Sequence, residues 1–138
     1  MIRNRFLIPV LFLVLFHCKK KESDSDKDIY EWKTINVTAS AYNSLAYQTD
    51  SNPSIAAFGD TLTPGMKCIA VSRDLLELGL EHNTPVKIEG LDSLYLVKDK
   101  MNKRWKKHID VYMGTDVKAA RKWGKKKVAI TYGVLIEK

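Results

Sequence analysis

The chain has 138 residues, which is room for one ordinary domain and its core but not for two domains. It carries 23 lysine and arginine residues against 16 aspartate and glutamate residues, a formal net charge of +7. Twelve of the basic residues lie between residues 98 and 127, where three aspartates accompany them. Such a patch can attract an acidic glycan or anionic lipid, but the chain has no nucleic-acid-binding motif, and solvated lysines on strand edges and a helix face explain much of the charge.

Residues 1–18 predict an export signal rather than part of the domain. Two arginines precede an eleven-residue apolar run, residues 6–16, which is shorter than the about 20 residues that span a bilayer. Cys18 follows and leads into the polar tract KKKESDSDKD, an order that resembles a bacterial lipoprotein signal with Cys18 as the lipidated residue. We therefore expect an exported protein, lipid-anchored in the bacterial cell envelope, with residues 19–33 as a flexible linker. An uncleaved N-terminal anchor is the alternative.

An ordered domain is expected from residue 34 to the end of the chain. INVTASAY, residues 35–42, alternates apolar and polar positions as a half-buried strand does. The long loop that follows, residues 43–65, is rich in Asn, Ser, Asp, Gly and Pro, and such loops in compact domains tend to carry function. KCIAVS predicts a short buried strand, and SRDLLELGL offers Ser72 as the cap of one helical turn that stops at a glycine.

The second half of the chain adds more strands and one helix. TPVKIEG and LYLVKD predict two strands joined by a turn, and IDVYM predicts another. TDVKAARKWG predicts a short helix with Thr115 as its cap and Gly124 just beyond its basic end. KKVAITYGVLI closes the chain as a strand. About six strands with one or two short helices, and no internal repeat, predict a mainly β fold, a small six-stranded barrel.

The sequence gives little support for a reactive cysteine or for a metal site built from histidines. If Cys18 carries lipid, Cys68 is the one cysteine left, and its apolar surroundings predict a buried small hydrophobe. His82 lies in a turn, and His108 alternates outward beside Ile109, so we expect both at the surface and without metal-ligand spacing. No Gly-rich phosphate loop, nucleophile elbow or serine–histidine pattern appears, so the sequence predicts neither a metal nor a cofactor.

Two aspartates, Asp99 and Asp110, lie eleven residues apart in a run otherwise crowded with lysine and arginine. Alternation in LYLVKD puts Asp99 on the face of Tyr95 and Val97, and alternation in IDVYM puts Asp110 on the face of Tyr112. A carboxylate beside the apolar residues of a strand either pairs with a cation or lines a cleft. This spacing is compatible with two arrangements: the two aspartates form ion pairs at the ends of their strands, or they line one cleft together.

The segment that runs from IAVSRDLLELGL through YLVKDKMNKRWKKHIDVYMGTDVKAARKWGKKKVAITY resembles the 3D domain, a bacterial family named for three aspartates. The resemblance covers about residues 36–132, and its most specific part is the spacing of Asp99 and Asp110, followed by an aromatic strand and AARKWG. It implies a double-psi β-barrel related to the C-terminal part of membrane-bound lytic transglycosylase A. Ser72 stands where the family has its first aspartate, with Asp74 two residues on, and KMNKRWKK replaces a glycine-rich stretch.

The resemblance implies cleavage of the β-1,4 bond between N-acetylmuramic acid and N-acetylglucosamine in peptidoglycan, with the muramyl 6-hydroxyl closing a 1,6-anhydro ring. One carboxyl group first protonates the leaving oxygen and then takes the 6-hydroxyl proton, and we assign this role to Asp110. Asp99 would raise the pKa of Asp110 or bind sugar hydroxyls, the two meeting in one cleft from adjacent strands. The substrate-binding candidates are Tyr42, which stacks on a sugar ring or packs in the core, Ser72, Asp74, and the basic Lys100 and Arg104, which would contact carboxylates of peptidoglycan.

Two other classes of function fit the same residues. A non-catalytic cell-wall module would bind glycan or scaffold the envelope; rare lipoprotein A-like and expansin-like barrels share the architecture, and fold alone never fixes activity. Ser72 favours this alternative, and the spacing of Asp99 and Asp110 favours the enzyme. A basic lipoprotein that contacts anionic membrane headgroups is the third possibility. We expect a monomer that binds no nucleic acid.

Overall fold

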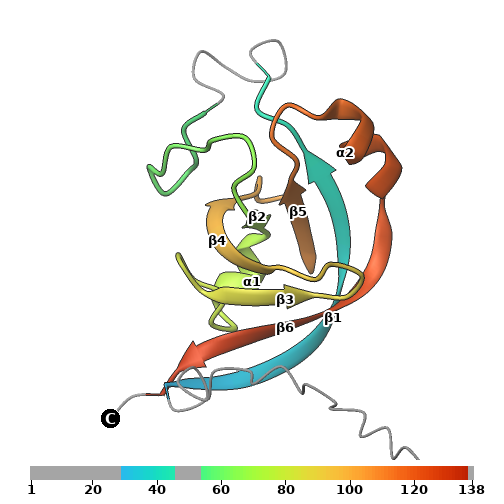
Figure 1. Ribbon diagram of the computed structural model, residues 1–138. Coiled ribbons are helices and arrows are strands. Elements are labelled where there is room, and N and C mark those ends of the chain that lie inside the picture. Colours follow the sequence, from blue (N-terminus) through green and yellow to red (C-terminus); the bar gives the residue numbers. More distant parts are fainter. Residues whose placement is uncertain (1–28, 46–53, 137–138) are drawn as a thin grey trace, which may run out of the picture.

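A computed structural model describes residues 29–45 and 54–136 of the chain. The export signal, Cys18, most of the predicted linker and the middle of the predicted long loop lie outside these residues. The six strands close into a barrel in the order β1-β5-β2-β4-β3-β6 (Figure 1). The predicted mainly β fold, a six-stranded double-psi barrel with two short helices, is confirmed. The elements are β1 (Tyr30–Tyr42), β2 (Cys68–Val71), α1 (Arg73–Leu76), β3 (Pro85–Ile88), β4 (Leu94–Lys100), β5 (His108–Tyr112), α2 (Val117–Trp123) and β6 (Lys126–Leu135).

The strand order brings distant segments of the chain together. Strand β2 lies between β4, with which it pairs in parallel, and β5, with which it pairs antiparallel. Strand β1 pairs in parallel with β5 and antiparallel with β6. Two parallel pairs therefore stand among antiparallel ones. Because parallel strands cannot be joined by a tight hairpin, other elements separate them in the chain: β3 lies between β2 and β4, and β2, β3 and β4 lie between β1 and β5.

Strand β1 begins at Tyr30, inside the predicted linker and before the predicted start of the domain. Its first residues pair with the end of β6. Trp32 is half-buried in this pairing, whereas Glu31 and Lys33 are exposed. The alternation of a half-buried strand is thus present here. The segment was expected to be linker because its exposed positions are occupied by charged residues.

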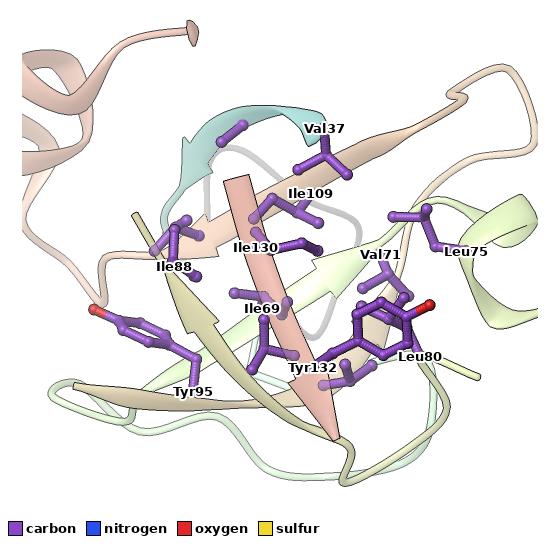
Figure 2. Close-up of a cluster of buried hydrophobic side chains, with 14 of the residues drawn as sticks. Val37, Ile69, Val71, Leu75, Leu80, Ile88, Tyr95, Ile109, Ile130 and Tyr132 are labelled. Carbon is purple, nitrogen blue, oxygen red and sulfur yellow. The ribbon is translucent and has the colours of Figure 1, made fainter. Parts of the chain in front are cut away.

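Apolar side chains that alternate along the strands fill the inside of the barrel. Fully burying one such side chain contributes about 1.5–3 kcal/mol relative to leaving it exposed. Leu75 of α1 and Leu80 extend this core at one end of the barrel. The strand residues of this core with at most 1% of their surface exposed are Val37, Ala39, Ile69, Val71, Val86, Val97, Ile109, Val111 and Ile130, and Figure 2 shows several of them.

A second, smaller apolar cluster lies on the outside of the barrel, where residues of the loop before β2 cover β2 and β5. Ala56 and Leu62 of the loop pack there with Cys68 and Tyr112. Cys68 is fully buried, as predicted, and burial raises the pKa of its thiol to about 11. The thiol is therefore protonated near neutral pH and behaves as a small hydrophobe.

Both helices are short. Helix α1 follows Ser72, whose side chain makes no capping hydrogen bond. Helix α2 is capped by Asp116 rather than by the predicted Thr115: the carboxylate accepts a hydrogen bond from the Ala119 N–H at 2.9 Å. Gly124, with φ of 66°, ends the helix. Neither of these helices, the two in the described part of the chain, has the length and apolar character to cross a membrane.

Candidate functional site

A β-bulge in β4 decides which way Asp99 points. Ile69 of β2 pairs with Val97, but the next residue, Ala70, pairs with Asp99, so Lys98 is the extra residue. Val97 is buried inside the barrel, whereas Asp99 lines a cleft on the outside together with Ala70. The predicted common face for Val97 and Asp99 is therefore wrong, because strict alternation holds only in a strand without a bulge.

Asp99 and Asp110 lie on either side of Ala70. Ala70 pairs with Asp99 of β4 on one side and with Asp110 of β5 on the other. Both carboxyl groups line one open cleft of about 190 Å³. The two aspartates thus share a cleft, as the sequence predicts, but their strands are not adjacent, because β2 lies between them. The other residues that line the cleft are Tyr42, Lys100, Met101, Asn102 and Trp105.

Asp110 occupies an environment that favours its protonated form. It stands in β5 between Ile109 and Val111, which point into the barrel. Burial raises the pKa of Asp110 above its ordinary value, and the negative charge of Asp99 raises it further. The Ser40 hydroxyl, 2.9 Å from Oδ1, opposes both effects by donating to the carboxylate. A carboxyl group with a raised pKa keeps its proton closer to neutral pH, as a general acid must.

Asp99 is held by backbone donors rather than by a cation. Its Oδ1 accepts hydrogen bonds from the Ala57 N–H at 2.7 Å and from the Lys100 N–H at 2.8 Å. No ion pair among residues 29–45 and 54–136 involves Asp99 or Asp110. The structure therefore favours the shared cleft over ion-paired strand ends. The bond from Ala57 also ties the loop that covers the barrel to the edge of the cleft.

Two aromatic side chains line the cleft. Tyr42 packs on the Tyr112 ring at 5.4 Å between centroids, and its buried hydroxyl finds no hydrogen-bond partner among the described residues. Burial raises the pKa of Tyr42, so the phenol stays protonated and can donate to a ligand. Trp105 was not assigned a role from the sequence. Trp105 is the one aromatic residue in KMNKRWKK, and this feature of the sequence could have indicated a place in the cleft.

Basic side chains surround the aromatic part of the cleft. Lys100 lines the cleft, and its ammonium lies 5.2 Å from the centroid of the Phe58 ring. The guanidinium of Arg104 lies 5.3 Å from the centroid of Trp105, and the ammonium of Lys125 lies 5.4 Å from it. Lys100 thus lines the cleft, whereas Arg104 does not line it and lies over the ring of Trp105, which does.

Ser72 and Asp74 are not among the residues that line the cleft. Ser72 is fully buried, and its Oγ accepts a hydrogen bond from the His108 N–H at 3.0 Å. The Asp74 carboxylate accepts a hydrogen bond from the Lys107 N–H at 2.9 Å. Both side chains hold the start of β5 in place, so the structure gives the two predicted substrate-binding residues a supporting position rather than contact with a ligand.

His108 is buried, with 3% of its surface exposed, and not at the surface as predicted. It does alternate outward from Ile109, but its ring packs under Trp105 at 4.6 Å between centroids. Nε2 of His108 lies 2.7 Å from the hydroxyl of Ser40, which also contacts Asp110. Sequence reasoning missed Ser40 and His108 because the contact depends on the parallel pairing of β1 with β5, which no local pattern reports.

A larger cavity, of about 440 Å³, lies elsewhere on the barrel and includes Tyr30, Glu81 and His82 in its lining. His82 is exposed, as predicted, and its Nε2 contacts the carboxylate of Asp60. Glu81 is the single carboxylate in the lining, so this cavity does not have the paired carboxyl groups of the cleft. Within the described residues, no group of three or more His, Cys, Asp or Glu could hold a metal ion.

Comparisons with known proteins give a distant likeness in structure. No protein-family model matches the chain, and no curated protein sequence matches it. A ligand-free expansin from Clavibacter michiganensis has a TM-score of 0.45 and 18% sequence identity, covering 76% of this chain and 51% of the expansin. A mutant Clavibacter michiganensis expansin in complex with cellohexaose has a TM-score of 0.45 and 16% identity over the same shares. The chain therefore spans about half the length of these expansins.

Proposed function

We propose that this chain is a cell-envelope protein whose cleft binds a peptidoglycan glycan strand and cleaves it, with Asp110 as the acid/base. The observation that carries the proposal is the position of Asp110: a half-buried carboxyl group with a raised pKa, next to a second carboxylate across Ala70. The proposal rests on this cleft and on the resemblance to the 3D domain, not on the likeness to expansins.

The size of the cleft supports a polymer as the ligand. Its volume of about 190 Å³ is below the roughly 300–1,000 Å³ of pockets that enclose a small molecule. An open cleft of this size can hold part of a chain that continues on both sides. Tyr42 and Trp105 offer ring faces for sugar stacking, and Lys100 and Arg104 offer positive charge to the carboxylates of lactyl groups and stem peptides.

The proposed reaction needs one carboxyl group in two protonation states. Asp110 gives its proton to the glycosidic oxygen as the bond from that oxygen to the anomeric carbon breaks. The Asp110 carboxylate then takes the proton of the muramyl 6-hydroxyl as that oxygen bonds to the anomeric carbon, which closes the 1,6-anhydro ring and leaves Asp110 protonated again. No water is consumed, which separates this reaction from the two-carboxylate hydrolysis of ordinary glycosidases. Asp99, fixed by two backbone donors, supplies the negative charge that helps Asp110 hold its proton.

The test is a set of variants assayed on purified sacculi. The full-length chain in detergent should release 1,6-anhydromuropeptides, detected by mass spectrometry, between about pH 4 and pH 8. Asp110→Asn should lower the rate by about 10²–10⁴-fold without lowering the melting temperature, since the side chains are nearly isosteric. Asp99→Asn should be milder and should move the pH optimum down, because it removes a charge that raises the pKa of Asp110. The matched control is Asp92→Asn, the same change at an exposed turn, which should leave the rate unchanged.

One observation favours a second candidate, a barrel that binds glycan without cleaving it. The family's first aspartate position is occupied here by Ser72, which is buried and hydrogen-bonded to the backbone of β5. If wild-type protein sediments with sacculi but yields no anhydro products at any pH tested, the binding module is correct and the enzyme is not. If Asp99→Asn is inactive while Asp110→Asn retains activity, the reaction class stands and the two roles are exchanged.

Export and anchoring through Cys18 are part of the same proposal, and they lie outside the described residues. The apolar run, Cys18 and the polar tract support them. Cys18→Ser should leave the signal uncleaved or release the protein from the membrane fraction. Identical fractionation and identical mature mass of wild type and variant would rule out lipidation at this position.

A further inference from the structure

Three side chains on the outside of β1 and β5 form a continuous hydrogen-bonded chain. Oγ of Ser40 lies 2.9 Å from Oδ1 of Asp110 and 2.7 Å from Nε2 of His108. The parallel register explains this geometry: Ser40 stands directly opposite Asp110, and Thr38, two residues earlier, stands opposite His108. Ser40 is therefore the link between a carboxyl group in the cleft and an imidazole beneath Trp105.

The order of the three groups differs from that of a serine–histidine–aspartate triad. In a serine–histidine–aspartate triad the histidine lies in the middle, takes the serine proton and is oriented by the aspartate. Here the serine lies in the middle and contacts both partners. A hydroxyl has one proton to donate and two lone pairs to accept with, so it can serve its two neighbours in either direction. It donates to Asp110 when Asp110 is a carboxylate, and accepts from Asp110 when Asp110 is protonated.

We propose that Ser40 relays a proton between His108 and Asp110, so that the three side chains hold and exchange one proton as a unit. In the forward step, doubly protonated His108 gives its Nε2 proton to Oγ of Ser40, while Ser40 gives its own proton to Oδ1 of Asp110. The products are neutral His108 with its proton on Nδ1, an intact Ser40 hydroxyl and a protonated Asp110. One positive and one negative charge are neutralised, and the number of protons is unchanged.

The surroundings of both ends favour this direction of transfer. Burial lowers the pKa of His108, and the positive charges of Lys125 and Lys127 lower it further. Burial and Asp99 raise the pKa of Asp110. Both effects reduce the difference between the two groups in their affinity for a proton, so transfer from His108 to Asp110 is easier than between an ordinary imidazole and an ordinary carboxyl group. The other charged or titratable groups near the unit are Lys100 and Tyr42 in the cleft, and Lys107 with Asp74 beside the start of β5.

The consequence for catalysis rests on the proposed function. A glycan strand over the cleft would shut Asp110 off from solvent, while His108 approaches it from the other side of Ser40. The relay would keep Asp110 loaded with the proton that it gives to the glycosidic oxygen. Ser40 and His108 are then positioning residues, since neither lines the cleft.

The test is an NMR titration of the full-length chain, which needs no substrate. The ¹⁵N signals of the His108 ring and the ¹³C signal of the Asp110 carboxyl are followed against pH. If the two groups share a proton, each signal should titrate in two steps with common midpoints, as groups coupled by more than about one pH unit do. Ser40→Ala should convert both to single, independent steps, and Ser40→Thr, which keeps a hydroxyl, should restore the coupling. The matched control is Ser44→Ala, which removes a hydroxyl bound to Tyr112 but not to this unit.

Each outcome decides the proposal. Independent single-step titrations in the wild type, or unchanged coupled titrations in Ser40→Ala, would overturn the relay. Should Ser40→Ala fail to fold, Asp110→Asn serves instead: it should lower the pKa of His108, and no change there would also overturn the relay. If the protein cleaves sacculi but His108 and Asp110 titrate independently, the relay is wrong and the proposed function stands. If the two groups titrate together but sacculi are not cleaved, the proposed function is wrong and the relay stands.

Discussion

The two faces of strand β5 differ at Ile109, Val111, His108 and Asp110 although they share one backbone. Toward the inside, Ile109 and Val111 are fully buried among aliphatic side chains. Toward the outside, the alternate residues His108 and Asp110 meet Ser40 in a polar network, and Asp110 borders the cleft. The inner face stabilises the barrel, and the outer face carries the titratable groups. Substitutions on the two faces should therefore have separable effects.

The largest expected effect is on the inner face. Ile109→Ala should lower the free energy of unfolding by about 2–5 kcal/mol, because it leaves a cavity in a closed core. The neighbouring Asp110→Asn should not lower it at pH 7, because it removes a desolvated carboxylate without changing the shape of the side chain. Urea unfolding of both variants measures the contrast. An equal loss of stability in the two would mean that the faces are not energetically separate.

The same contrast explains what the sequence could and could not predict. Alternation within a strand separates Asp110 from Ile109 and Val111, because it needs only the neighbours along the chain. The outer face depends on three things that alternation does not report: the bulge at Lys98, the insertion of β2 between β4 and β5, and the packing of Trp105 over β5. Sequence reasoning therefore placed the two aspartates in one cleft but gave the wrong face for Asp99.

The pH dependence of stability gives a second test of the outer face. Asp110 and His108 should change the stability of the fold in opposite directions as the pH rises. The raised pKa of Asp110 means that the folded state binds this proton more tightly, so its contribution to stability is lost as pH rises from about 3.8 through the folded pKa. The lowered pKa of His108 means that the unfolded state binds that proton more tightly, so stability is lost as pH falls from about 6.5 through the folded pKa.

Denaturant unfolding from pH 3 to pH 8 separates the two contributions. Asp110→Asn should be more stable than wild type at pH 7 and no more stable at pH 3. His108→Gln should show a smaller loss of stability than wild type between pH 6.5 and pH 4. Parallel curves for the wild type and both variants would show that neither group is titrated differently in the folded protein.

A smaller effect is expected where the outer face is covered by an aromatic ring. Trp105→Ala should raise the pKa of His108 toward its ordinary value, because removal of the indole admits water to the imidazole. It should also weaken binding to sacculi by up to about tenfold, the size of one lost aromatic contact of about 0.5–1.5 kcal/mol. The matched control is Trp32→Ala, since Trp32 lies on β1 under Lys87 and does not line the cleft. An equal loss of binding in both variants would assign no special role to Trp105.

The smallest effect is expected at the bulge itself. Lys98 is the extra residue of β4, and its ammonium donates to Asp60 at 2.9 Å and to Asn83 at 2.6 Å. Lys98→Ala removes these contacts, and because the Asp60 pair is only partly buried and keeps some contact with solvent, the loss of stability should be the smallest in this series and should shrink further in high salt. The bulge is a property of the backbone register, so Asp99 should stay in the cleft and continue to raise the pKa of Asp110. An NMR titration of the Asp110 carboxyl checks this: a midpoint that falls in Lys98→Ala would show that the lysine side chain, and not the register, holds Asp99 on the outer face.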